Sequence, residues 1–64
     1  MKRRQFLQYL IRHGCEILAE GGNHTRLRNP SNGLRSVLPR HREIKPGLIR
    51  TICKQLNIPI PSER

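Results

Sequence analysis

The chain has 64 residues, which is enough for one domain with a lean hydrophobic core. Thirteen Lys and Arg residues stand against four acidic ones, giving a formal net charge of +9, and ten of the thirteen are Arg. This excess favours a protein that binds polyanions, nucleic acid first, over a surface that is basic only for solubility. Gln8 and Arg12 interrupt the apolar run after the basic start. The sequence therefore predicts neither a signal peptide nor a membrane span, and we expect a cytoplasmic protein.

The first predicted element is a helix over residues 3–13. Its apolar residues recur at the spacing of one helical stripe, and Gly14 follows where a helix end favours a left-handed residue. The stripe consists of Phe6, Leu7, Leu10 and Ile11.

Three strands are predicted next. From residue 15 the period changes to two, so Cys15, Ile17 and Ala19 should share one face of a strand. A turn at residues 21–23 leads to a second strand over residues 24–28. The loop 29–33 suits a hairpin with its last glycine at a bulge position, and a third strand runs from residue 34 to 38, where Pro39 stops it.

A second helix is predicted to begin at Pro46, because proline is favoured in a first helical turn. Asn57 can take the left-handed position at its end, and the chain from residue 61 onward should fray. The predicted core-facing stripe consists of Ile49, Ile52, Cys53 and Leu56.

The order helix, three strands, helix predicts a single α+β domain over residues 1–64. Three strands with short turns form an antiparallel sheet, and two helices should cover one of its faces, as in a double-stranded-RNA-binding domain. Cys15 and Cys53 have no C-x-x-C or zinc-like spacing, so we expect both to be reduced core residues. No metal or other cofactor is predicted.

The polar residues restrict the chemistry. The four acids, Glu16, Glu20, Glu43 and Glu63, are scattered, whereas a two-metal nuclease needs converging carboxylates. Catalysis would then depend on histidine and cations. RNA suits this, because a histidine can accept the proton of the 2′-OH while Arg or Lys stabilises the phosphoryl charge.

His24 is the candidate base. His24, Arg26 and Arg28 alternate along the second strand, so they should share the open face of the sheet, with Thr25 and Leu27 facing the helices. Alternation alone does not distinguish this site from a solvated strand face that carries an ordinary surface histidine.

The other two histidines are weaker candidates. His13 closes the first helix, where it can interact with the helix dipole, and His41 lies in a basic loop where it could contact phosphate. The predicted RNA-binding residues are Arg26, Arg28, Arg35, Arg40, His41, Arg42 and Lys45. The turn Gly21, Gly22 and Asn23 should support the site by letting a phosphate approach the backbone.

Six short segments give the chain a resemblance to the HicA family, small mRNA interferases of type II toxin–antitoxin modules, over roughly residues 2–58. In chain order they are Lys2-Arg3-Arg4, His13-Gly14, Gly21-Gly22-Asn23-His24-Thr25, Arg28-Asn29-Pro30, Pro39-Arg40-His41 and Glu43-Ile44-Lys45-Pro46-Gly47.

The resemblance implies a metal-independent endoribonuclease toxin of double-stranded-RNA-binding-like fold, whose catalytic histidine matches His24. The implied partners are an mRNA substrate and a HicB-like antitoxin, with a homodimer or a larger toxin–antitoxin assembly compatible with the family. The chain departs from the family at Cys15 and Arg26-Leu27, where many members have aromatic or β-branched residues.

The alternative function is a non-catalytic RNA-binding module of the same fold. A typical double-stranded-RNA binder has a basic cluster at the start of its last helix, where this chain has Lys45 alone. The chain is also short for a protein that must span two minor grooves. A DNA-binding regulator is disfavoured further, because no helix is rich in base-reading residues. We therefore expect a nuclease.

Overall fold

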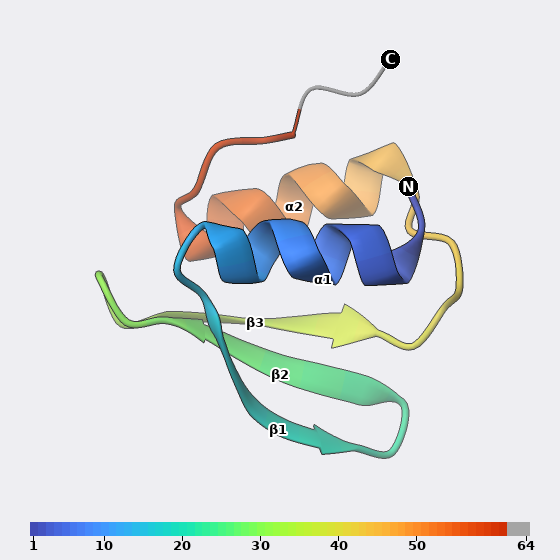
Figure 1. Ribbon diagram of the computed structural model, residues 1–64, viewed down its shortest axis with the longest axis horizontal. Helices are drawn as coiled ribbons and strands as arrows, with labels where there is room; N and C mark the ends of the chain where they lie inside the picture. The colour runs from blue at the N-terminus through green and yellow to red at the C-terminus, as the bar shows by residue number, and fades with distance from the viewer. Residues whose placement is uncertain (62–64) are drawn as a thin grey trace.

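The computed structural model describes residues 1–61 and has the predicted α-β-β-β-α order (Figure 1). The expected fraying beyond residue 61 lies outside the described residues. The elements are α1 (Arg3–Arg12), β1 (Glu16–Gly21), β2 (His24–Asn29), β3 (Leu34–Pro39) and α2 (Pro46–Leu56). The strands form one antiparallel sheet in the order β1-β2-β3, which confirms the predicted α+β fold.

Both helices lie on the same side of the sheet, and both begin at the same end of the domain (Figure 1). The core lies between the two layers. It takes residues from the inward faces of both helices, from β2 and β3, and from the chain just before β1 and just before α2. It consists of Phe6, Leu10, Cys15, Leu27, Leu38, Ile44, Ile49, Ile52, Cys53 and Leu56. Within residues 1–61 no helix covers the other face of the sheet, which remains open to solvent.

The helices follow their sequence patterns to different degrees. The four stripe residues of α2 are all buried, and Asn57 ends the helix in the left-handed region at φ 56°. In α1 the predicted stripe was too wide, because Leu7 is only partly buried and Ile11 is 50% exposed. α1 ends at Arg12, one residue earlier than predicted, and Gly14 has the positive φ that the sequence predicted, at +91°.

The predicted face of β1 is wrong. Ile17 pairs with Leu27 but Ala19 pairs with Arg26, so the register shifts at residue 18. Because Leu27 and Arg26 point to opposite faces of β2, Ile17 and Ala19 also point to opposite faces. A bulge that skips one residue cannot be read from the period of a single strand. It moves Ala19 to the open face beside Arg26.

The strand β2 follows the predicted alternation. Thr25 and Leu27 are fully buried against the helices, and the intervening side chains face the open side. In the following loop Gly33 has φ +76° and donates its amide to the Asn29 carbonyl at 2.7 Å, which closes the predicted hairpin. The Asn29 side chain donates to the Leu56 carbonyl at 2.9 Å and so attaches this hairpin to the end of α2.

Both cysteines are free thiols in the core, as predicted. Burial raises the pKa of the Cys15 thiol, and burial together with the neighbouring Cys15 raises the pKa of Cys53 to about 11. Both therefore remain protonated near neutral pH and act as small apolar residues. Neither helix within residues 1–61 has the length and apolar character that a bilayer span requires.

Candidate functional site

A two-residue turn presents His24 at the start of β2. Gly21 pairs with His24, which leaves Gly22 and Asn23 as the central turn residues. Gly22 has φ +57°, whereas Asn23 is not in the positive-φ region, so the turn has the pattern of type II′, which matches the twist of a hairpin. His24 is exposed and lies opposite Pro39 of β3.

The open face of the sheet is hollowed around this histidine. One hollow is lined by the turn, His24 and the neighbouring strand residues Ala19, Arg26 and Val37. A second hollow shares those three strand residues and continues to Leu18 and Arg35. The open face therefore provides one shallow, solvent-open groove that runs from His24 along β2.

Three of the predicted cations lie on this face, because Arg26, Arg28 and Arg35 occupy matching positions of β2 and β3. Arg28 stands opposite Arg35, and its Nη1 contacts Glu16 Oε2 at 2.6 Å. The Glu16 carboxylate thereby offsets the repulsion between two like charges on adjacent strands. Arg26 makes no ion pair within residues 1–61 and is the sheet-face cation nearest along the strand to His24.

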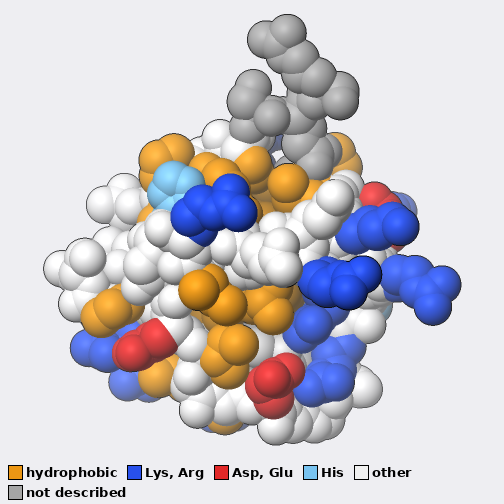
Figure 2. All heavy atoms as spheres, viewed as in Figure 1, with side chains coloured by type: hydrophobic (Ala, Val, Ile, Leu, Met, Phe, Trp, Pro, Cys, Tyr) orange, Lys and Arg blue, Asp and Glu red, His pale blue; other side chains and the backbone are white. Residues whose placement is uncertain are grey.

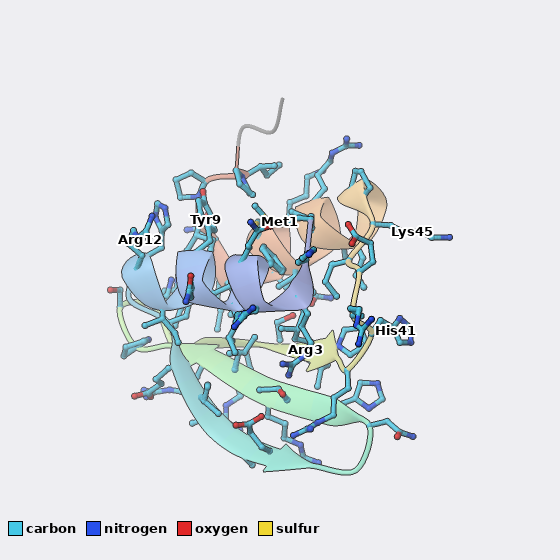
Figure 3. The ribbon with its side chains drawn as sticks, turned by 45° about the vertical axis from the view of Figure 1, so that its right-hand side comes forward. Met1, Arg3, Tyr9, Arg12, His41 and Lys45 are labelled. Atoms are coloured by element: carbon cyan, nitrogen blue, oxygen red, sulfur yellow. The ribbon has the colours of Figure 1, made fainter. Side chains whose placement is uncertain are left out.

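The other predicted cations form a separate group in the β3–α2 loop. Figure 3 shows His41 and Lys45 at this end of the domain, pointing outward. The Arg40 amide donates to the Asn23 carbonyl at 3.1 Å, so the loop begins directly beside the turn. The Arg40 guanidinium contacts Glu20 Oε1 at 3.1 Å. The predicted set is thus divided between the sheet face and the end of the sheet.

Three cations that sequence reasoning did not assign to the site join the second group. Lys2, Arg3 and Arg4 line a hollow together with Arg40 and Arg42, and we call these five residues the basic hollow. Lys and Arg side chains gather at the corresponding end of the molecule (Figure 2). The run Lys2-Arg3-Arg4 was visible in the sequence, but nothing local placed it beside residues 40–42.

A hydrogen-bond network around the buried Thr25 supports His24 from the helix side of the sheet. Arg3 Nη2 donates to the hydroxyl of Thr25, and Arg3 Nε donates to the Pro39 carbonyl at 3.2 Å. The Thr25 hydroxyl in turn donates to Glu20 Oε1 at 3.3 Å. Thr25 follows His24 in the chain, and Pro39 lies opposite it. Arg3 therefore contacts the side chain that follows His24 and the backbone of the residue opposite it.

Among the titratable groups of residues 1–61, His24 is the candidate for proton transfer on the open face. Glu16, Glu20 and Glu43 each form an ion pair with a different cation. Residues 1–61 contain no group of three or more His, Cys, Asp or Glu side chains that could hold a metal ion. His13 packs against Tyr9 in the helix layer, with ring centroids 4.3 Å apart.

Fold and site together define a small basic α+β domain whose open sheet face combines one exposed histidine with arginines. The model of the family described as HicA toxin of bacterial toxin–antitoxin systems matches residues 3–58. The chain belongs to the HicA toxin family. Comparisons with curated proteins and with solved structures gave no match.

Substitution of Gly22 tests whether the turn before His24 requires a residue with positive φ. We expect Gly22→Ala to lower the free energy of unfolding by about 1–2 kcal/mol, because φ +57° is strained for a residue with a Cβ. Gly21→Ala is the matched control, since Gly21 is not in the positive-φ region and nothing lies within 4 Å of an added Cβ. Urea denaturation of both variants measures the difference, and equal stabilities would contradict the type II′ assignment.

Proposed function

We propose that this HicA-family chain is a metal-independent endoribonuclease, an mRNA interferase whose uncontrolled activity makes it a toxin in the cytoplasm. The observation that supports it most directly is the exposed His24 on the open sheet face, two residues from Arg26, in a groove that solvent and substrate can enter. Membership of the HicA toxin family supports the toxin role.

In the proposed reaction His24 accepts the proton of a ribose 2′-OH. The 2′-oxygen attacks the adjacent phosphorus, the new O–P bond forms, and the bond from phosphorus to the 5′-oxygen breaks. The 5′-oxygen leaves with the electron pair of the broken bond and takes a proton from a water molecule, and His24 then returns its proton to the solvent. The products are one end with a 2′,3′-cyclic phosphate and one end with a 5′-OH.

Arg26 is the proposed electrostatic partner of His24. The two residues alternate on β2, so both side chains lie on the groove side of the sheet. A guanidinium beside the reacting phosphate stabilises the negative charge that develops on its non-bridging oxygens. Arg35 lies farther along the groove and would hold a neighbouring phosphate. Because the described acids are paired with cations, this mechanism relies on no carboxylate-bound metal.

Replacing His24 with Ala tests the mechanism. We expect RNA cleavage in the presence of EDTA to fall by a factor of about 10²–10⁴, the contribution typical of general acid–base catalysis. RNA affinity should change little, because every cation remains. Gel analysis of cleavage and binding on the same RNA measures both effects, and growth inhibition on expression should disappear with cleavage.

His13→Ala is the control, because His13 lies in the helix layer against Tyr9 and outside the groove. It should leave the cleavage rate nearly unchanged. Cleavage at the parent rate by the His24→Ala variant would refute the assignment and direct attention to His41. RNA binding without cleavage by the unaltered chain would instead favour the non-catalytic alternative.

We also propose that a HicB-like antitoxin silences the toxin by covering the open face. Toxin–antitoxin systems pair a toxin with such a partner, and the groove here mixes the cations Arg26 and Arg35 with exposed apolar side chains. Val37 is 45% exposed and Leu18 is 43% exposed. A partner that presents acidic groups around an apolar or aromatic anchor would complement this surface.

The change Val37→Lys tests this docking surface. It should weaken antitoxin binding by about tenfold or more, because it places a charge where an apolar contact is expected. Ile11→Lys is the matched control, since Ile11 is similarly exposed but lies on α1 in the helix layer. Calorimetric titration of both variants with the purified partner gives the comparison. A complex that remains fully active with His24 exposed would rule out this mode of inhibition.

A further inference from the structure

We propose that the basic hollow (Lys2, Arg3, Arg4, Arg40 and Arg42) is a second phosphate-binding site for the RNA whose cleavage is proposed above. The RNA strand would then cross the end of the sheet, with one phosphate at His24 and its neighbours in the hollow. The identity of the bound strand rests on the proposed function. The site itself is argued from the following contacts and charges.

Long-range backbone contacts build the hollow. The Arg3 amide donates to the Arg42 carbonyl at 2.9 Å, and the Ile44 amide donates to the Met1 carbonyl at 2.8 Å. Lys2 and Glu43 form the bridge between these two bonds. The start of the chain is therefore fixed beside the β3–α2 loop, and its cations cannot disperse as they would on a loose terminus.

Two of the four guanidinium groups in the hollow remain available for a ligand, and the Lys2 side chain is exposed as well. Arg4 and Arg42 are exposed, and neither side chain makes a hydrogen bond or ion pair within residues 1–61. Arg3 and Arg40, by contrast, are engaged with Thr25, with the Pro39 carbonyl and with Glu20. The hollow thus has a structural base and two free guanidinium groups, which suit bidentate contacts to phosphate oxygens.

The helix dipoles add to this positive potential. Both helices begin at the end of the domain that carries the hollow (Figure 1), and neither has an acidic residue in its first turn. Each helix N-terminus carries a partial positive charge of about half a unit, which disfavours cations there. The chain nevertheless has Lys2, Arg3 and Arg4 at the start of α1 and Lys45 at the start of α2. A bound anion would relieve this repulsion.

The hollow lies beside the turn that presents His24. Arg40 hydrogen-bonds to Asn23 of the turn, and Arg3 hydrogen-bonds to the carbonyl of Pro39, the residue opposite His24. A strand that reaches His24 over this end of the sheet would pass beside the hollow. Its phosphates would meet free guanidinium groups there, whereas Arg28 on the sheet face is already paired with Glu16.

The composition of the hollow favours RNA over a protein partner. All five lining residues are cationic, and no apolar side chain joins them. Protein interfaces depend on buried apolar or aromatic anchors, for which the open face offers Val37 and Leu18. A site made only of cations is typical of sequence-independent phosphate contacts.

The experiment compares two double variants with equal charge change. Arg4→Ala with Arg42→Ala removes the free cations of the hollow, and Arg12→Ala with Lys54→Ala removes one exposed cation from the last turn of each helix. The probe is an oligoribonucleotide with every 2′-OH methylated, which preserves the phosphates and prevents 2′-OH attack. Binding is measured against salt concentration, and urea denaturation verifies that both variants fold.

The hollow variant should bind about tenfold more weakly at about 0.1 M salt, with a log–log salt slope shallower by about 0.7 for each phosphate that the variant no longer neutralises. The control should retain the parent slope. Equal slopes for the two variants, while the parent still cuts unmodified RNA, would overturn this inference and leave the proposed function intact. If the hollow variant lost antitoxin binding but kept RNA binding, that result would also overturn the inference. A parent chain that binds no RNA would overturn both proposals.

Discussion

The burial of Thr25 and Leu27 against the helix layer is the constraint on which the rest of the site depends. Both side chains are fully buried, and their alternation places the other side chains of β2 on the open face. A slip of one residue in the pairing of β2 would exchange the two faces, burying His24 and exposing the core residues. The energetics of the core therefore determine which side of the sheet carries the histidine and its arginines.

Thr25 also links this constraint to the basic end of the domain. Its hydroxyl is held between Arg3 of α1 and Glu20 of β1, and Glu20 is held in turn by Arg40. One buried polar group thus connects the first helix, the edge strand and the β3–α2 loop around the turn that presents His24. A buried hydroxyl with satisfied partners is stabilising, whereas the same hydroxyl without them would be costly.

Local patterns in the sequence were sufficient for much of the fold. The stripe of α2, the alternation of β2 and the glycine turns were all predicted, because each depends on the periodicity or conformational preference of a few adjacent residues. The bulge in β1 was not predicted, because it is a property of the pairing between two strands. The basic hollow was missed for a similar reason, since residues 2–4 and 40–42 meet only through tertiary hydrogen bonds. The role of His24 stays a prediction that the exposed position supports.

The most direct test of the central proposal removes a single 2′-oxygen from the substrate. After the cut in a defined RNA has been mapped, the nucleotide on the 5′ side of the scissile phosphate is changed to its 2′-deoxy form, and the reaction is repeated in EDTA. If His24 activates the 2′-OH, cleavage at that position should disappear, while the parent RNA yields 2′,3′-cyclic phosphate and 5′-OH ends. Cleavage of the 2′-deoxy substrate at the parent rate, or 5′-phosphate ends on the parent RNA, would contradict the mechanism.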